Sequence, residues 1–340
     1  WNNCNQLRVS LPCTALRVRN FREDDMLDYK IYYLEFDNGV RFGKGTLEDT
    51  DITFRSDTLF SALYQEALKI ERQDQFLQWI KDGKIVLSDA FPCIKGTYFL
   101  PKPMLRVING DDTGRGNSVE KKLYKNMKFL PQQYLKDYVR GKFPREHLED
   151  MKNIGSVNMK VSAAIRGLEE PSPYRVSAFY FQSNCGLYFL VGYEEKTQFE
   201  MMDELINSLS YRGLGGKKSA GLGRFFPVCK EVLEDFKVRL RTEEKKCREG
   251  KKYILLSNGL PEEEELEDVM ESASYSLLKR SGFVDSPDYA EQQMRKRDLY
   301  VFGAGSCFCK TFRGMLVQER NGGTHPIYRY ERALFLEVDI

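Results

Sequence analysis

The segment from Tyr211 to Phe225, YRGLGGKKSAGLGRF, combines five glycines with two lysines and two arginines. Glycine has no Cβ and adopts positive φ readily, so a ligand can approach the backbone closely. Successive backbone N–H groups in such a conformation bind anions. The segment therefore predicts a phosphate-binding loop made of Gly213, Gly215, Gly216, Lys217, Lys218, Ser219, Gly221, Gly223 and Arg224.

Two nucleotide-binding motifs are excluded by spacing. A P-loop needs a glycine five residues before Gly216 and Ser or Thr after the lysine, but Tyr211 and Lys218 occupy those positions. The dinucleotide fingerprint fails because Lys218 stands where its third glycine belongs. A flexible linker is the remaining alternative, and the apolar residues Leu214, Leu222 and Phe225 among the glycines argue against it.

Other chemical groups are sparse or lack a recognisable spacing. The only histidines, candidates for a general base, are His147 in a charged stretch and His325 in a predicted turn. The eight cysteines form no C-x-x-C pair, and Cys307 and Cys309 lack zinc spacing, which favours a reducing cytoplasm without metal or cofactor. Because the net charge is only +2, any nucleic-acid site would have to be a local basic patch. The sequence has no run of 18 apolar residues, so it predicts no membrane-spanning helix.

Hydrophobic periodicity predicts the elements that position the loop. In order they are a strand over 29–36, a helix over 59–68, a strand over 85–87, a hairpin of 176–181 with 187–191, a helix over 199–209 and a strand from Phe225. This order approximates β-α-β-β-α-β, the ferredoxin-like plan, with an enlarged connection over 106–173.

A second round of structure is predicted after the glycine loop. A strand begins at Tyr253, an acidic helix contains Leu266, Val269 and Met270, and further strands are predicted at 275–278, 299–302, 315–317 and 333–338. Between 236 and 250 apolar periodicity gives way to charge. The chain of 340 residues has room for two domains, so we expect an α+β fold with an N-terminal extension (1–25), a first domain (26–236) and a second domain (250–340).

An ordered set of motifs extends over roughly residues 29 to 338. They are SDTLFSAL (56–63), LSDAFP (87–92), LPKP (100–103), GLGGKKSAGLG (213–223), KRSGFVDS (279–286), GAGS (303–306) and HPIYRY (325–330). In these motifs the chain resembles the RAMP superfamily of CRISPR proteins, and within it the family of fourth subunits of type III-A (Csm) interference complexes.

The resemblance implies two ferredoxin-like (RRM-like) domains and an RNA-binding subunit without nuclease activity. Such a subunit caps the 5′ handle of the crRNA and bridges the large polymerase-like subunit to the repeating backbone subunit. The family's protruding thumb corresponds imperfectly to 158–167, which suggests Lys160 and Arg166 as thumb contacts.

Base recognition in RNA needs aromatic or arginine planes and hydrogen-bonding edges near splayed nucleotides. The candidates are Arg55 and Ser56 at the start of the first helix, and Tyr328 with Arg329. Helix capping is the alternative role for Arg55 and Ser56, and core packing is the alternative for Tyr328.

Two other classes of function stay open on sequence alone. An endoribonuclease of the same superfamily would process guide RNA with His147 or His325, or cleave target RNA with a divalent metal and an aspartate such as Asp57. A pure protein adaptor would use the glycine loop only to turn the chain.

Overall fold

The computed structural model describes residues 27–105, 118–164, 172–286, 288–319 and 322–340. The predicted extension over 1–25 and the predicted thumb residue Arg166 therefore lie outside the described residues. The helices are α1 (Ser56–Lys69), α2 (Gln73–Lys81), α3 (Ser118–Asn126), α4 (Leu135–Val139), α5 (Lys196–Arg212), α6 (Glu234–Lys237) and α7 (Glu263–Met270), with 3₁₀ turns η1 (Gln132–Tyr134), η2 (Arg145–Asn153) and η3 (Lys218–Ala220).

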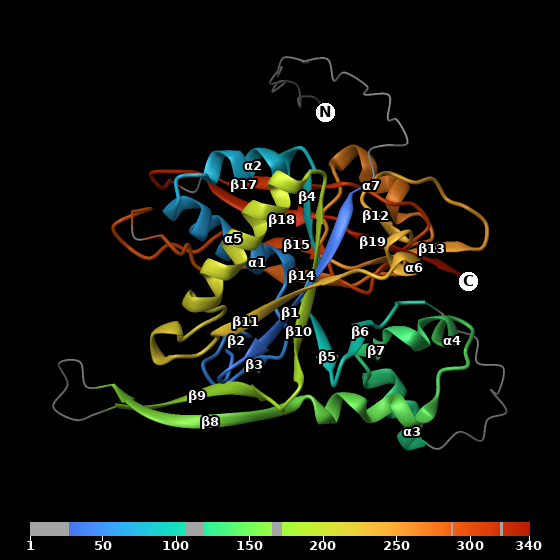
Figure 1. The fold of residues 1–340 in the computed structure, drawn as a ribbon, viewed down its shortest axis with the longest axis horizontal. Coiled ribbons are helices and arrows are strands. Elements are labelled where there is room, and N and C mark those ends of the chain that lie inside the picture. The colour runs from blue at the N-terminus through green and yellow to red at the C-terminus, as the bar shows by residue number, and fades with distance from the viewer. Residues whose placement is uncertain (1–26, 106–117, 165–171, 287, 320–321) are drawn as a thin grey trace, which may run out of the picture.

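A seven-stranded antiparallel sheet forms the first half of the molecule (Figure 1). Its strands are β1 (Asp28–Phe36), β4 (Ile85–Leu87), β5 (Phe91–Ile94), β6 (Thr97–Pro101), β7 (Phe129–Pro131), β10 (Cys185–Tyr193) and β11 (Phe225–Glu231). The order β11-β1-β10-β5-β6-β7, with β4 also on β10, places β1 and β10 at the centre. Every position of β10 is buried, as the apolar run in its sequence predicts.

Helices α1 and α5 pack together, and α5 also packs on β10 and β11. One polar contact between the helices is buried: the Glu66 carboxylate accepts hydrogen bonds from Ser208 at 2.6 Å and from Arg212 at 3.2 Å. Burial alone would raise the pKa of Glu66, but its bonds to Lys69, Ser208 and Arg212 lower it below the ordinary value. The contact fixes the end of α5, where the glycine loop begins.

The predicted hairpin over 176–181 and 187–191 is wrong in its pairing, although both segments are strands. β9 (Ser172–Phe181) pairs with β8 (Gly155–Ala164), while β10 pairs with β1, β4 and β5. Since β10 already has neighbours on both edges, β9 takes a partner from the preceding segment. The β8–β9 ribbon extends beyond the sheet along the lower edge of Figure 1.

The second half contains a four-stranded sheet in the order β12-β19-β13-β16 and two ribbons. The strands are β12 (Leu240–Arg241), β13 (Lys251–Leu255), β14 (Leu277–Arg280), β15 (Leu299–Phe302), β16 (Cys307–Phe308), β17 (Gly314–Glu319), β18 (Ile327–Arg332) and β19 (Phe335–Asp339). A small ribbon in the first half joins β2 (Phe42–Gly43) to β3 (Thr50–Asp51). The predicted acidic helix is confirmed as α7.

One hydrophobic core joins the two halves. It contains Leu34 and Leu63 from the first half together with Leu256, Tyr330 and Leu336 from the second. The Tyr330 hydroxyl accepts a hydrogen bond from the Leu87 N–H at 2.8 Å, so the contact between the halves is specific as well as apolar.

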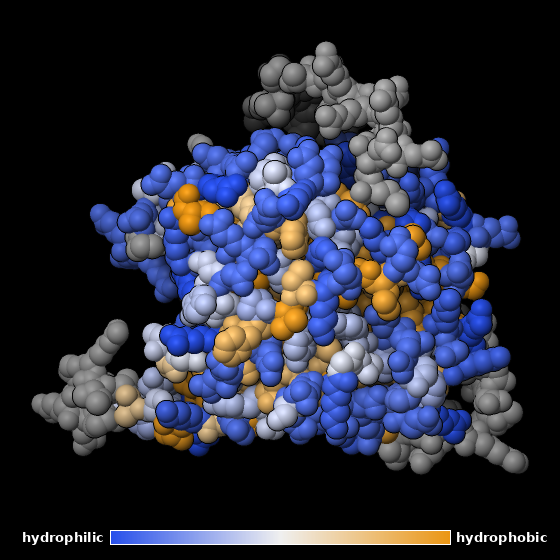
Figure 2. All heavy atoms as spheres, viewed as in Figure 1, coloured by the Kyte–Doolittle hydropathy of each residue, from blue (hydrophilic) through white to orange (hydrophobic). Residues whose placement is uncertain are grey.

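The face of the molecule in Figure 2 is mostly hydrophilic, with apolar side chains gathered over β11. Phe226 and Val228 of that strand are both exposed. No helix among the described residues has both the length and the apolar composition to cross a membrane.

Candidate nucleic-acid interface

The glycine loop begins where α5 ends and folds against itself and the chain after β1. The Leu214 N–H donates to the Gly223 carbonyl at 2.9 Å, which closes the loop. The Gly216 N–H donates to the Arg41 carbonyl at 2.8 Å, and the Gly223 N–H donates to the Gly39 carbonyl at 3.0 Å. The loop is therefore an ordered part of the fold.

Three of its glycines are required by close backbone approach as well as by positive φ. Gly213, Gly215 and Gly223 have φ of 82°, 90° and 82°. A Cβ on Gly223 would lie 2.0 Å from the Leu214 carbonyl oxygen, and one on Gly215 would lie 2.5 Å from the Arg41 carbonyl oxygen. Only glycine fits both restrictions.

The loop presents fewer free N–H groups than the sequence suggests. Within the loop, the N–H groups of Gly213, Gly216, Gly221 and Gly223 donate to protein carbonyls. The prediction that backbone N–H groups from Gly213 to Gly223 hold phosphates is therefore corrected for these four groups. What the loop offers a ligand is mainly side-chain charge on a rigid turn.

A cleft of about 520 Å³ lies between the glycine loop, the start of α1 and the second half of the chain. The loop contributes Gly213, Leu214, Gly215, Gly216 and Lys218; the second half contributes Arg280, Ser281, Phe283, Asp285 and Lys296. Phe283 is about half exposed and gives this wall an accessible aromatic ring. The structure thus joins the predicted loop and the predicted helix start in one concave site.

The cleft is positively charged. Five cationic side chains line it (Arg41, Arg55, Lys218, Arg280 and Lys296), against three acidic ones (Asp51, Asp57 and Asp285). Within the described part of the chain, neither Lys218 nor Lys296 has an ion-pair partner, so their charges remain available. Burial lowers the pKa of both lysines, which means that each ammonium has lost hydration that a bound anion would replace.

The start of α1 is occupied by an internal carboxylate. Asp89 is fully buried and accepts hydrogen bonds from the Ser56 N–H at 2.8 Å and from Arg55 at 3.0 Å. The Ser56 side chain is also buried, and its hydroxyl accepts a hydrogen bond from the Asn258 N–H at 3.1 Å. Of the two predicted residues, Arg55 lines the cleft, whereas Ser56 joins the two halves of the chain.

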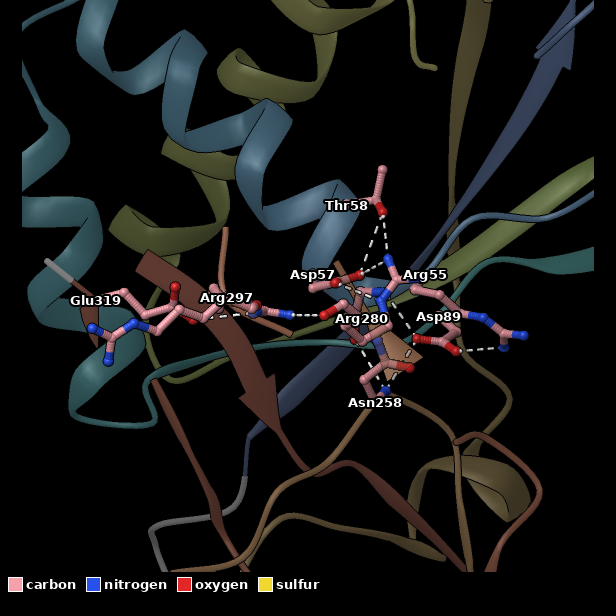
Figure 3. A network of polar contacts seen from close by, with 10 residues as sticks. Arg55, Asp57, Thr58, Asp89, Asn258, Arg280, Arg297 and Glu319 are labelled. Atoms are coloured by element: carbon pink, nitrogen blue, oxygen red, sulfur yellow. Dashed lines mark hydrogen bonds and ion pairs between the residues drawn. The ribbon is translucent and has the colours of Figure 1, made fainter. Parts of the chain in front are cut away.

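Arg280 lines the cleft from the second half of the chain and contacts the start of α1 (Figure 3). Its guanidinium donates two hydrogen bonds of 2.8 Å to the Asp57 carboxylate at the start of α1, and a third of 3.2 Å to Thr58. The two bonds to Asp57 give the bidentate geometry in which arginine is strongest. Asp57 is thereby used to hold the second half against the first.

Arg329 is buried, and its hydrogen bonds all lie inside the protein. It donates to the Arg297 carbonyl at 2.8 Å, to the Arg280 carbonyl at 2.9 Å and to Glu319 at 3.0 Å. These bonds support the backbone that presents Arg280. A contact between Arg329 and RNA would require them to break, so we place it last among the predicted contacts.

The remaining predicted residues lie outside the cleft lining. Tyr328 is half-buried against Tyr64, with the Lys81 ammonium 5.6 Å from its ring centre. Lys217 lies 5.1 Å from the ring centre of Tyr174 on β9, which brings the glycine loop to the β8–β9 ribbon. Lys160 is exposed on β8 of the same ribbon.

Neither histidine lines the cleft. His147 binds Asp150 through Nδ1 at 2.8 Å and packs against Tyr134. His325 lies closer to the cleft, because its Nε2 is 3.0 Å from the hydroxyl of Ser286, the residue after Asp285. Its Nδ1 lies 3.0 Å from the Pro326 carbonyl, which can only accept, so the neutral ring carries its proton on Nδ1.

Sequence reasoning missed Arg41, Asp89, Arg280 and Lys296. Two of them belong to motifs that were recognisable, since Asp89 lies in LSDAFP and Arg280 in KRSGFVDS. Their roles depend on a contact between distant segments, which local spacing does not reveal. Arg41 and Lys296 had no local signal.

Three comparisons relate the chain to known proteins. Residues 248–338 match the model of the CRISPR Csm4 C-terminal domain. The chain is 33% identical over 314 residues to "CRISPR system Cms protein Csm4" of Mycobacterium tuberculosis, covering 92% of this chain and 98% of that protein. It is 32% identical over 320 residues to the protein of the same name from Streptococcus thermophilus, covering 92% and 100%.

Solved structures share the fold. A chain from the Csm3–Csm4 subcomplex of the type III-A CRISPR–Cas interference complex superposes with a TM-score of 0.61 at 18% identity, covering 92% of this chain and all of that one. A chain from a Csm1–Csm4 cassette with pppApA gives a TM-score of 0.60 at 19% identity, covering 92% and 98%.

Proposed function

The chain belongs to the Csm4 family of CRISPR proteins, and from that premise we propose that it binds the 5′ handle of crRNA without catalysing a reaction. The RNA backbone lies in the cleft between the glycine loop, the start of α1 and Arg280. Phosphates contact Lys218 and Lys296, and Arg224, Lys217 and Ser219 extend the contact along the outside of the loop. Contacts of this kind position RNA without selecting its sequence.

The observation that supports this proposal most directly is the pair of cleft lysines without ionic partners. Arg280 and Arg55 are already paired with the carboxylates of Asp57 and Asp89, and Arg41 donates a hydrogen bond to the Thr46 carbonyl. Lys218 and Lys296 are partly desolvated at a cost to the free protein, and a phosphate would offset that cost. Phe283 offers a face on which a base can stack.

We also propose that the chain forms a pair of ferredoxin-like domains with a thumb, and the strand order of the first sheet supports the first of them. Taken in chain order, β1, β4 with β5, β10 and β11 are the four strands of a β-α-β-β-α-β unit, with α1 and α5 as its helices. We assign the described residues between β6 and β9 (102–105 and 118–164), which include β8, to the thumb. We assign the second domain to residues 250–340.

We further propose that the chain assembles with a large polymerase-like subunit and with the first copy of a backbone subunit. The support is the fold shared with chains in Csm1–Csm4 and Csm3–Csm4 structures. In such a complex the chain would bridge the two subunits at the 5′ end of the guide.

The test uses the complex purified from cells that contain a CRISPR array. We expect Lys218→Ala with Lys296→Ala to abolish protection of the 5′ handle from nuclease while the subunit remains incorporated. The salt dependence of RNA binding should also flatten by roughly 0.7 in log–log slope for each lost phosphate contact. Lys196→Ala, on the exposed side of α5, is the matched control. Unchanged handle protection in the double variant would reject the cleft as the RNA site.

An endoribonuclease is the second candidate, and the position of His325 is the observation that favours it. Its Nε2 is unprotonated in the neutral ring and contacts Ser286, the residue that follows Asp285 of the cleft lining. In that position it could accept the proton of an RNA 2′-hydroxyl. Repeat RNA incubated with the purified chain should remain intact if our proposal is correct. Cleavage that His325→Ala abolishes would favour the nuclease instead.

A further inference from the structure

One cysteine, Cys247, lies in the segment that connects the two halves of the chain, and a second, Cys309, lies in the segment bound to it. The connecting segment (242–250) runs from β12 to β13, and it is bound to the residues after β16. The Lys245 N–H donates to the Thr311 hydroxyl at 2.6 Å, and the Lys245 carbonyl accepts from the Thr311 N–H at 3.1 Å. Counting two residues further along each segment in the antiparallel sense reaches Cys247 on one segment and Cys309 on the other.

The two thiols are neighbours by a second observation. The Cys309 thiol makes the largest contribution to the pKa of Cys247, which it raises through a side-chain hydrogen bond. Cys247 is exposed and Cys309 is half-buried, so both can be reached by a small oxidant.

A lysine contacts the inner thiol. The Lys252 ammonium lies 2.7 Å from the Cys309 sulfur and 3.1 Å from the Ser272 carbonyl, which fixes its position. An ammonium beside a cysteine stabilises the thiolate, the form that reacts. The site therefore contains a thiol with a cationic neighbour and a second thiol in position to resolve its oxidation product.

We propose that Cys247 and Cys309 form a reversible disulfide site that responds to peroxides. The Cys309 thiolate attacks hydrogen peroxide, giving a sulfenic acid and hydroxide. The Cys247 thiolate then attacks the sulfenic sulfur, forms the S–S bond and releases a second hydroxide. The two thiol protons neutralise the hydroxides, so two thiols and one peroxide give one disulfide and two waters.

The disulfide would fix the connecting segment to the second half of the chain. In the reduced protein this attachment depends on Thr311, whose hydroxyl also donates to the Glu243 carbonyl. A cross-link between residues 247 and 309 makes the attachment covalent and restricts the unfolded chain.

The test is intact mass and peptide mapping of the full chain, reduced and then treated with hydrogen peroxide. We expect a loss of about 2 Da, for two hydrogen atoms, and one linked peptide pair containing Cys247 and Cys309. Dithiothreitol should restore the original mass. The oxidised protein should also unfold several degrees higher, because the cross-link closes a long loop.

Two variants make the test specific. Cys309→Ser should abolish the linked peptide, whereas Cys229→Ser, at an exposed cysteine on β11, should leave it unchanged. Lys252→Met keeps both thiols and should slow oxidation several-fold at neutral pH. Absence of a linked peptide in the wild-type protein would overturn the site. An unchanged rate in Lys252→Met would overturn the role of the lysine, and a link from Cys247 to another cysteine would overturn the pairing.

Discussion

At the scale of single residues, the cleft contains charge that the fold does not neutralise. Lys296 is the clearest case, because its neighbours Arg280 and Arg329 are committed to Asp57 and to backbone carbonyls. A cation held in this way costs free energy in the unbound protein and is useful only when an anion arrives. Such a residue lowers the stability of the free protein and increases its affinity for an anion.

Lys296→Met should therefore stabilise the free protein and weaken RNA binding. The apolar part of the side chain is kept while the desolvated ammonium is removed, so we expect the free energy of unfolding to rise by about 0.5–1 kcal/mol. Denaturant unfolding measures the first effect and RNA titration the second. Lys279→Met, a neighbouring lysine paired with Asp298 at the surface, serves as the control. Loss of stability in Lys296→Met would contradict the assignment.

Glu331 is a buried carboxyl group, and neither of its oxygens has a hydrogen-bond partner among the residues that the structure describes. Burial raises its pKa well above 4.5, and Asp57 adds to the effect, so the folded protein holds this proton more tightly than the unfolded chain does. The stability that protonated Glu331 allows is therefore fully present below about pH 4.5. It is lost as the pH rises above that value, because the unfolded chain then releases the proton more readily than the folded protein does.

Glu331→Gln should remove that loss. The amide has nearly the same shape and does not ionise, so the variant should be more stable than the parent at pH 7 by about 1–3 kcal/mol and equal to it near pH 4. Denaturant unfolding at a series of pH values measures the difference. A constant difference across the range would show that ionisation of Glu331 is not the cause.

At the scale of elements, local pattern predicted the strands and helices better than their partners. The spacing of Leu59, Phe60 and Leu63 identified α1, because the buried residues of an amphipathic helix recur every three or four positions in the sequence. The segment 176–181 was recognised as a strand but assigned the wrong neighbour. Strand pairing depends on which edges remain free after the whole sheet has assembled, and local sequence holds little information about that.

The glycine loop was predicted from composition, but for an incomplete reason. The sequence suggested glycines that expose N–H groups to phosphate, whereas several are required because the loop packs tightly on itself. Charge and backbone shape are separate contributions in this loop. Lysine substitutions should affect RNA, and glycine substitutions should affect folding.

Gly223→Ala tests that separation. The backbone of Gly223 has φ of 82°, and a Cβ added there would lie 2.0 Å from the Leu214 carbonyl oxygen. We therefore expect a loss of about 2–4 kcal/mol in the free energy of unfolding. Gly45→Ala is the matched control, since Gly45 also has positive φ but no atom within 4 Å of its Cβ position. Its cost should be about 1 kcal/mol. Equal effects of the two substitutions would show that backbone strain, not contact, decides.

At the scale of the whole molecule, the cleft exists only because the two halves meet. The sequence placed the glycine loop and the start of α1 in the first domain, and it gave no reason to bring residues 280–296 beside them. The shared core around Leu256 and Tyr330 fixes the general arrangement. The polar contacts from Asn258 to Asp89 and from Arg280 to Asp57 fix its register.

Arg280→Met should open the cleft without changing the glycine loop. The substitution leaves the Asp57 carboxylate without its bidentate partner, and we expect a loss of about 1–3 kcal/mol in the free energy of unfolding together with weaker RNA binding. Combining it with Asp57→Asn removes the unpaired charge and should recover most of the stability. If the joined walls of the cleft form the RNA site, the double variant should still bind RNA weakly, because Arg280 no longer holds its wall in place. Recovery of RNA binding together with stability would contradict this, because it would show that the Arg280–Asp57 contact is not needed to hold the RNA site together.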